Sequence, residues 1–390
     1  MHKRNNIALL IILFIIIIIG CKSSPTEPVN DFTSEDIQAA IDSAADGDTV
    51  FIPAGRSTWS ERVEIRKEIY LIGAGIDSTI ITRIGGGEAF YINITANERI
   101  RISGMTIDGN GESNGIISHY AKNFRIDNNK FQNCITGLIL WDYSYGVIDH
   151  NIFFDIIVEG LVIYGDDAEG WDRENTYITT YGDNLGHPEF IFIEDNDFIY
   201  SENGEVDYLA HAVASNHGAR YVFRYNSINA LYIEDRLHLP SAIDMHGNFS
   251  YGRGTVAFEV YNNVIDSEHS YRGINIRGGT GVIFNNEFTG DFTHPIHMTN
   301  YRSWGTPANE IPGGCPIGDY DPYYCADDYP CIDQINNLYI WDNTYNGNTV
   351  QAEIDDRGYN TVHIQEGRDY FHEMRPGYTP YTYPHPLVSN

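Results

Sequence analysis

The sequence predicts an all-β solenoid with one N-terminal capping helix, and three observations carry that prediction. One motif recurs along the 390 residues, the segments around it alternate apolar and polar residues, and Gly, Asn and Asp separate these short segments. The hydrophobic content of 42% is enough for a large core. The 54 acidic and 24 basic residues give a net charge of −30, which argues against nucleic acid as a partner.

The N-terminus has the layout of an export signal. Basic residues precede an apolar run at 7–19, which is shorter than the roughly 18 to 20 residues of a membrane-spanning helix. The end of the run, Ile-Ile-Gly-Cys at Cys21, resembles a bacterial lipobox, in which the Cys thiol is acylated. We therefore expect a lipoprotein signal peptide at 1–20, lipidation of Cys21, a flexible tether at 21–31 and a place in the bacterial cell envelope, at the outer membrane or cell surface. An ordinary signal peptide with an incidental Cys is the alternative.

Export would place the other four cysteines in an oxidising compartment. Cys315, Cys325 and Cys331 fall in the segment 303–333, rich in Gly, Pro, Tyr and Asp, which we expect to be an insertion stapled by a disulfide. Cys134 is the fourth, and the sequence does not give the pairing. Zinc is the rival interpretation, but neither a CxxC motif nor a His at ligand spacing accompanies these residues.

A short amphipathic helix is predicted at 33–46. Thr33 and Asp36 have the spacing of a capping pair, the apolar residues that follow share one face, and Gly47 is the expected end. We expect this helix to cover the open end of the solenoid, where an exposed strand edge would invite aggregation.

From Thr49 onward the pattern changes to short alternating strands, and a unit of strand, Asn, any residue and a large apolar residue recurs. The spacings indicate coils of about 22 to 30 residues, with one coil skipped after Asn151 and a long loop before Asn343. Because Asn tolerates left-handed backbone angles and can bond a stacked neighbour, we expect a structural ladder. Its members are Asn129, Asn151, Asn196, Asn226, Asn263, Asn286 and Asn343.

These coils resemble the pectin-lyase-like superfamily of right-handed parallel β-helices, and the segment DIQAAIDSAADGDTVFIPAG resembles the usual start of that fold. The resemblance implies a single right-handed parallel β-helix over 32–375, with insertion loops at about 165–188 and 303–333 and a Tyr- and Pro-rich tail at 376–390. It leaves the function open, because the superfamily contains polysaccharide lyases, glycoside hydrolases, esterases, epimerases, phage spikes and non-catalytic surface proteins.

Catalytic side chains in such a fold should point outward from equivalent positions of adjacent coils. Three strands end in SNHG at 215–218, DMHG at 244–247 and NIRG at 275–278. Aligning their glycines predicts one outward column and a second column beside it. The first contains Tyr164, His217, His246, Arg277 and His297, and the second contains Ser215, Asp244 and Asn275. Polar residues on a solvated sheet are the alternative for each member, and we interpret the aligned set as functional.

Arginine is concentrated in the same coils, and no lysine follows Lys130. A guanidinium group pairs bidentately with carboxylate or sulfate, so these coils are suited to an anionic sugar. Arg277 is the first candidate for this contact and Arg253 the second.

An acidic segment, GDDAEGWDRE, follows Tyr164 directly. Its carboxylates, Asp166 and Asp167 among them, would suit calcium. Alternatively, Asp166 and Asp167 form an acid and base pair, with Trp171 stacking on a sugar ring. A solvated acidic loop is the third interpretation.

Three functions follow from these residues. The favoured one is a polysaccharide lyase, which removes the C5 proton of a uronate whose carboxylate is neutralised by Arg277 together with Arg253 or calcium. The base would be His246, oriented by Asp244, or His217, and Tyr164 would be the proton donor. We expect substrate contacts from Arg253, Asn275, His297 and Trp171.

The second function is a glycoside hydrolase of the polygalacturonase type that uses Asp166 and Asp167. The third is a non-catalytic glycan-binding surface protein with tail tyrosines such as Tyr378, Tyr381 and Tyr383 as stacking platforms. In each case we expect a monomer whose partners are a polysaccharide, most simply an anionic one, and a membrane reached through the lipid on Cys21.

Overall fold

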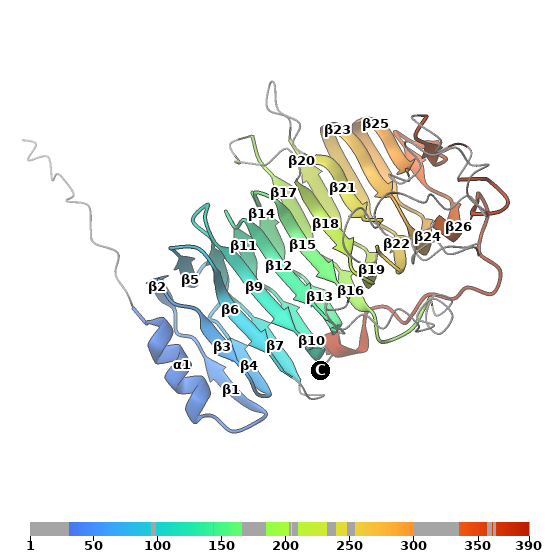
Figure 1. The fold of residues 1–390 in the computed structure, drawn as a ribbon. Helices are drawn as coiled ribbons and strands as arrows, with labels where there is room; N and C mark the ends of the chain where they lie inside the picture. The colour runs from blue at the N-terminus through green and yellow to red at the C-terminus, as the bar shows by residue number, and fades with distance from the viewer. Residues whose placement is uncertain are drawn as a thin grey trace, which may run out of the picture.

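The computed structural model describes residues 31–94, 99–142, 144–165, 185–202, 204, 210–231, 239–247, 254–299, 335–356, 361 and 364–389. These residues form a right-handed parallel β-helix, in which three long faces of parallel strands wind around one apolar core (Figure 1). We call the three faces sheets A, B and C, in the order in which each coil passes through them. The predicted fold class is confirmed.

Sheet A consists of β1 (Asp48–Phe51), β4 (Ile69–Ile72), β7 (Ile100–Ser103), β10 (Lys122–Asp127), β13 (Tyr145–Asp149), β16 (Ile191–Glu194), β19 (Arg220–Arg224), β22 (Ala257–Tyr261), β24 (Gly279–Phe284), β26 (Ile335–Trp341) and β30 (Tyr370–Phe371). Sheet B begins with β2 (Gly55–Trp59), β5 (Thr79–Arg83), β8 (Thr106–Asp108), β11 (Lys130–Gln132), β14 (Ile152–Phe154), β17 (Asp197–Tyr200) and β20 (Ser227–Ala230). It ends with β27 (Thr344–Tyr345) and β28 (Asn348–Thr349).

Sheet C contains β3 (Val63–Ile65), β6 (Glu88–Asn93), β9 (Asn114–His119), β12 (Thr136–Trp141), β15 (Glu159–Tyr164), β18 (His211–Asn216), β21 (Leu239–Met245) and β29 (Glu353–Ile354). Two long strands, β23 (Val264–Ile276) and β25 (Glu287–Met298), begin in sheet B and continue into sheet C.

The N-terminal helix α1 (Ser34–Ser43) covers the first coils, as expected (Figure 1). Thr33 and Asp36 form a capping box, and Ile37 and Ile41 are buried against the core. Gln38 accepts a hydrogen bond from the backbone N–H of Glu64, so the helix also satisfies the edge of β3. The predicted end near Gly47 was wrong, because Ala44 already has extended backbone angles.

The asparagine ladder is confirmed. The backbone N–H of each ladder Asn but the last donates to the side-chain oxygen of the Asn in the next coil, at 2.9–3.2 Å. The left-handed backbone angle was assigned to the wrong residue, because it belongs to the residue before each Asn, such as His150 (φ 54°) or Tyr225 (φ 56°). This preceding residue makes the bend and leaves the Asn side chain pointing into the ladder.

The prediction of a skipped coil after Asn151 was also wrong. Asn151 bonds Asn196 directly, and β13 pairs with β16, so the two residues belong to adjacent coils. The extra length lies within one coil, between β15 and β16, where 166–184 are outside the described residues. The other large insertion, between β25 and β26, also joins sheet C to sheet A, and Asn286 bonds Asn343 across it.

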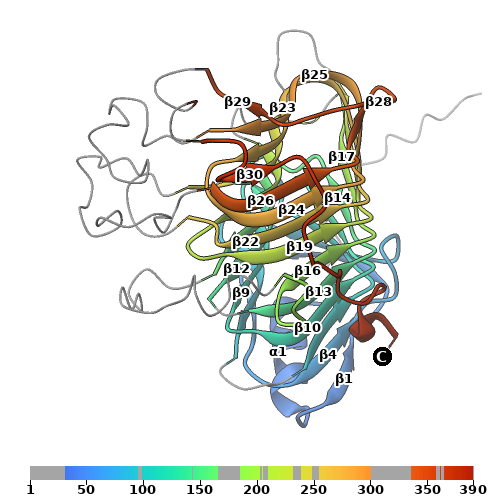
Figure 2. The same ribbon diagram turned by 90° about the vertical axis from the view of Figure 1, so that its right-hand side faces the viewer.

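The C-terminal segment packs on the outer face of sheet A and ends beside β10 and β13, as Figure 2 shows, with its last turn at η4 (Pro386–Ser389). Arg224 donates to the carbonyl oxygens of Tyr381 and Thr382, both at 2.8 Å. The Tyr381 ring lies against Phe192, and Tyr383 stacks on Tyr225. These rings are therefore part of the packing of sheet A, although Tyr383 stays 42% exposed.

Candidate functional site

The ends of the sheet C strands bring three of the predicted residues together. In the paired strands β21 and β23, Asp244 lies opposite Asn275, and Met245 lies opposite Ile276. The next residues along, His246 and Arg277, are therefore neighbours. Ile243, Met245, Ile274 and Ile276 are fully buried in the core, so alternation directs Asp244, His246 and Arg277 outward.

Asp244 is the centre of this cluster. Arg277 Nε donates to its Oδ1 at 2.8 Å, and Arg277 Nη2 also contacts its Oδ2. Asn275 Nδ2 donates to Oδ1 at 3.2 Å, and His246 Nε2 lies 3.5 Å from Oδ2. Burial alone would raise the pKa of Asp244, but the charges of Arg277 and His246 outweigh it and hold this pKa well below its usual range. The carboxylate is therefore ionised and able to orient His246.

His211 belongs to the same cluster and was missed in the sequence. Its Nδ1 lies 2.7 Å from the carbonyl oxygen of Ser241, and its Nε2 lies 3.5 Å from Asp244 Oδ2. Strict alternation would put His211 on the inner side with Val213, but Ala212 and Val213 are both in the core, so the alternation is broken between them. Burial lowers the pKa of His211 although Asp244 opposes this effect, so the ring is neutral near pH 7.

The predicted columns were wrong by one residue at β18. Tyr164 pairs with Asn216, and the backbone N–H of His246 donates to the carbonyl oxygen of Ser215, so Asn216 occupies the place expected for His217. His217 itself forms the left-handed turn after the strand, at φ 49°. Likewise Ala214, not Ser215, lies opposite Asp244. The glycines used for the alignment are not equivalent, because the coil of β18 has one more residue before its Gly.

His217 still lies beside the cluster. Its ring is 5.2 Å from that of Tyr164, measured between centroids. Burial, and to a smaller degree the charge of His246, lower the pKa of His217. Burial also raises the pKa of Tyr164, with a further contribution from Glu159, so this phenol keeps its proton at neutral pH.

His297 does not share the column of Arg277, which corrects a further prediction. It pairs with Asn275 and is only 1% exposed. Its Nδ1 lies 3.1 Å from the side-chain oxygen of Asn275 and 3.1 Å from Arg272 Nε. Asn275 is itself fully buried, so Asn275 contacts Asp244, and His297 contacts Asn275, from inside the protein.

The donor atoms of His211, Asp244 and His246 lie within 4.8 Å of one another, a set of nitrogen and carboxylate ligands that a transition metal could use. Arg277 already balances the charge of Asp244 through both carboxylate oxygens. This arrangement fits an ion-pair network better than a metal centre, because a bound cation would compete with Arg277 for the same oxygens.

Several predicted residues lie outside the described residues: Cys21, Asp166, Asp167, Trp171, Arg253, Cys315, Cys325 and Cys331. Cys134 is described, and it is free and buried. Burial raises the pKa of its thiol to about 12, so Cys134 is an unreactive core residue. Among the helices of the described residues, none is long and apolar enough to cross a membrane.

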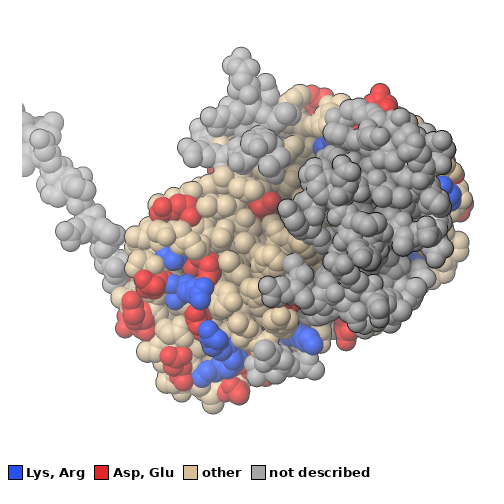
Figure 3. Space-filling model, viewed as in Figure 1, with Lys and Arg blue, Asp and Glu red and all other residues tan. Residues whose placement is uncertain are grey.

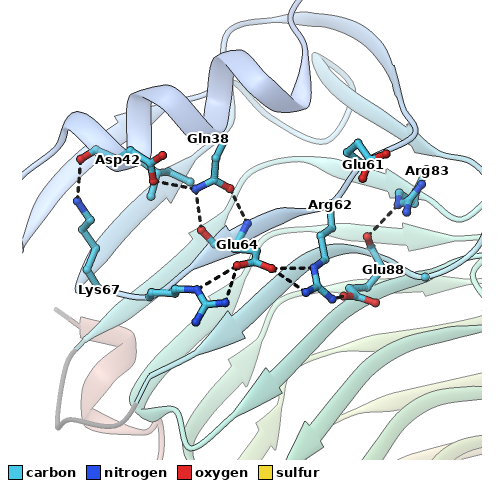
Figure 4. Close-up of a pocket in the computed structure, with 11 residues that line it drawn as sticks. Gln38, Asp42, Glu61, Arg62, Glu64, Lys67, Arg83 and Glu88 are labelled. Atoms are coloured by element: carbon cyan, nitrogen blue, oxygen red, sulfur yellow. Dashed lines mark hydrogen bonds and ion pairs between the residues drawn. The ribbon is translucent and has the colours of Figure 1, made fainter.

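A hollow of about 820 Å³ lies away from this cluster, between α1 and the first strands of sheet C (Figure 4). It contains several charged groups of both signs, visible as adjoining blue and red atoms at the α1 end in Figure 3. Arg62 pairs with Glu64 and Glu88, and Arg66 pairs with Glu64, each at 2.7 Å. These charges therefore pair with one another across the hollow.

Stacked coils with an outward polar cluster at the ends of one sheet define a pectate-lyase-like parallel β-helix protein. A family model described as "Rhamnogalacturonase A/epimerase, pectate lyase-like" matches residues 29–266, and the chain belongs to this family.

The chain is also similar to individual proteins. It is 34% identical over 94 residues to the pre-neck appendage protein of Bacillus phage B103, a match that covers 23% of this chain and 11% of the phage protein. Alginate lyase from Paenibacillus sp. str. FPU-7 has a similar structure, with a TM-score of 0.53 and 14% identity over 83% of this chain and 97% of the lyase. The A-module of mannuronan C-5 epimerase AlgE4 from Azotobacter vinelandii gives a TM-score of 0.49 and 16% identity, over 85% and 89% of the two chains. At these identities the structural likeness concerns the fold alone.

Proposed function

We propose that the protein is a carbohydrate-active enzyme that cleaves a uronate-containing polysaccharide by β-elimination at the Asp244 cluster. The observation that carries this proposal is a partly exposed His246 whose Nε2 lies 3.5 Å from a buried, ionised Asp244, with Arg277 beside it. A His that is oriented by an Asp and lies next to a fixed cation is suited to removing a weakly acidic proton. The family, which is described as pectate lyase-like, supports the same class of substrate.

The reaction needs a base, a cation and an acid. His246 takes the proton from C5 of the uronate, and Asp244 stabilises the imidazolium that forms. Arg277, held in a fixed plane by Asp244, supplies positive charge where the carboxylate becomes enolate-like. The electron pair of the C5–H bond forms the C4–C5 double bond, and the C4–O bond breaks. The leaving oxygen takes a proton from Tyr164, whose raised pKa keeps that proton available.

The described part of the site favours elimination over hydrolysis. An inverting glycosidase needs two carboxyl groups, one of them protonated. The described cluster offers Asp244 as its carboxylate, and the lowered pKa of Asp244 prevents it from acting as an acid. The alternative pair, Asp166 and Asp167, lies outside the described residues.

We also propose that the enzyme is exported, is anchored in the cell envelope through a lipid on Cys21 and acts as a monomer. The signal-like segment 1–20 supports this placement. A surface-anchored enzyme would meet a polymer that cannot enter the cell.

The product distinguishes the candidate functions. The protein is incubated with alginate, polygalacturonate and other uronate polysaccharides, and ultraviolet absorbance of the unsaturated product is followed. We expect His246→Asn to lower kcat by about 10²- to 10⁴-fold, whereas His269→Asn, an exposed His that pairs with Asp291, leaves kcat unchanged. New reducing ends without this absorbance would indicate hydrolysis, and retention of polymer without cleavage would indicate a binding protein. Either result overturns the proposal.

A further inference from the structure

One column of residues on the outward side of sheet C is apolar on the N-terminal side of the Asp244 cluster. Ile117 pairs with Ile139, Ile139 with Val162, and Val162 with Ala214, so the four residues form one column across adjacent strands. Ala214 in turn pairs with Asp244. Ile117 and Ile139 are partly exposed, whereas Val162 and Ala214 are buried. A sheet face that meets solvent normally carries polar residues, so the exposed apolar pair Ile117 and Ile139 indicates a binding surface.

A row of aromatic rings lies beside this apolar column. Trp141 stacks on Tyr164 with 4.0 Å between ring centroids and an interplanar angle of 22°. On its other side, His119 is parallel to Trp141 within 4°, at 6.0 Å. Tyr91 pairs with Ile117 and so begins the apolar column, and its ring lies 5.6 Å from that of His119. All four rings are partly exposed. His119 is held in place by Asp142, whose Oδ2 lies 2.9 Å from His119 Nδ1.

Both columns continue into the proposed catalytic site without a change of direction. The apolar column leads to Asp244, and the aromatic row leads through Tyr164 and Asn216 to His246. The strands that carry them, β6 to β21, lie side by side along the helix axis in Figure 1, and the surface over β9 and β12 in Figure 3 is largely free of charged side chains.

We propose that this aromatic strip, made of Tyr91, His119, Trp141, Ile117 and Ile139, binds the polysaccharide that is cleaved at the Asp244 cluster. The proposal rests on the proposed function and names a binding surface for it. Sugar rings have an apolar face of C–H groups, which packs on aromatic and aliphatic side chains, while their hydroxyl groups stay solvated. The continuity with the cluster indicates a carbohydrate chain that runs along the helix axis.

The distance from the far end of the strip to the Asp244 cluster predicts a preference for long substrates. Neighbouring strands lie about 4.8 Å apart, so the distance from Tyr91 on β6 to Arg277 beyond β23 is about 29 Å. At the far end, the Arg62 guanidinium lies over the Tyr91 ring at 4.2 Å, and the charged hollow of Figure 4 begins there. A short oligosaccharide at the cluster would leave most of this strip uncovered.

The test compares Trp141→Ala and Trp141→Phe with the unaltered protein, using the uronate polymer that is cleaved best and its trisaccharide. We expect Trp141→Ala to lower kcat/KM for the polymer about tenfold more than for the trisaccharide, and Trp141→Phe to retain most of the preference. Trp341→Ala is the matched control, since Trp341 is also a partly exposed Trp stacked on a ring, but on sheet A. Equal losses on both substrates, or no loss, would overturn the proposal.

A binding measurement separates this proposal from the proposed function. In the His246→Asn background, added polymer should quench the tryptophan fluorescence. This quenching should disappear when Trp141 is also replaced by Phe. If this quenching occurs but no polymer is cleaved by elimination, the result supports binding at the strip and contradicts the lyase proposal. If elimination occurs but replacing Trp141 changes neither affinity nor kcat/KM, the result contradicts binding at the strip and supports the lyase proposal. If Trp141→Ala had half the molecular mass of the unaltered protein in light scattering, the strip would instead bind a second copy of this chain. This result would also overturn the proposal that the strip binds polysaccharide.

Discussion

Arg277 and Asp244, 33 residues apart in the chain, form a two-point ion pair across adjacent coils: Nε donates to Oδ1 at 2.8 Å and Nη2 contacts Oδ2. The side chain of Asp244 is only 4% exposed and that of Arg277 13%. Asn275 and the two histidines of the cluster, His211 and His246, then surround the same carboxylate. One buried charge therefore organises the whole candidate site.

Replacing this charge should cost both stability and activity. For Asp244→Asn we expect a loss of about 3–5 kcal/mol in the free energy of unfolding, because Arg277 is left without its buried partner. Activity should fall as well, since His246 loses the group that orients it. Urea unfolding and initial rates measure the two effects. Asp291→Asn is the control: its side chain is 67% exposed, and its pair with His269 should contribute less than about 1 kcal/mol. A change below about 1 kcal/mol for Asp244→Asn would show that the pair is not organising the site.

Tyr164 should matter for chemistry more than for binding. Tyr164→Phe keeps the ring that stacks on Trp141 and removes the hydroxyl proton. We expect kcat to fall by about 10²-fold or more, with little change in the affinity of the His246→Asn background for polymer. Tyr339→Phe, which also keeps a ring stacked on an aromatic neighbour, is the control on sheet A. An unchanged kcat would assign proton donation to another group.

The asparagine ladder should be sensitive to a single substitution. Asn226 donates to the carbonyl oxygens of Ile193 and Arg224 and accepts from the backbone N–H of Asn196, all at 2.9–3.0 Å. Asn226→Ala leaves these buried groups unpaired, so we expect a loss of about 3 kcal/mol or more in unfolding free energy. Asn348→Ala, at an exposed position, should change it by less than about 0.5 kcal/mol. Equal, small effects of the two substitutions would mean that the ladder adds little stability.

Acid should weaken the docking of the C-terminal segment. Burial, with a smaller effect of the Arg224 charge, lowers the pKa of His385 from 6.5 to about 4. Between these values the unfolded chain binds a proton that the folded protein does not. The contribution of His385 is therefore complete above pH 6.5 and is lost as the pH falls toward 4, by up to about 3 kcal/mol.

Urea unfolding at pH 7 and pH 5 measures this slope. His385→Asn should flatten it, while His269→Asn, an exposed His, should leave it unchanged. Parallel pH profiles for His385→Asn and the unaltered protein would contradict the assignment, since the remaining slope would then come from other groups such as His211.

The repeat and the cap could be predicted because they depend on local signals. The ladder Asn recurs at the same place in each coil, and Thr33 with Asp36 is a complete capping signal within four residues. Asp244, His246 and Arg277 were also assigned to one site, because each lies at the end of a strand, or directly after it, next to inward Ile or Met residues. The prediction that His217 lies in one column with His246 was wrong. The turn after β18 has one additional residue, which shifts the alignment, and no local signal shows at which residue the backbone turns.

The sequence by itself determined the stacked coils, the capping helix and the clustering of Asp244, His246 and Arg277, because period and alternation specify which residues face the core. The tertiary structure alone decided that His211 joins Asp244, that His297 stays beneath it and that Tyr381 packs on Phe192. The first depends on an interrupted alternation, and the packing of the C-terminal segment joins residues as far apart in the chain as Arg224 and Tyr381, which are separated by 157 positions. A local pattern cannot encode them, since they form only when stacked coils fix which surfaces meet.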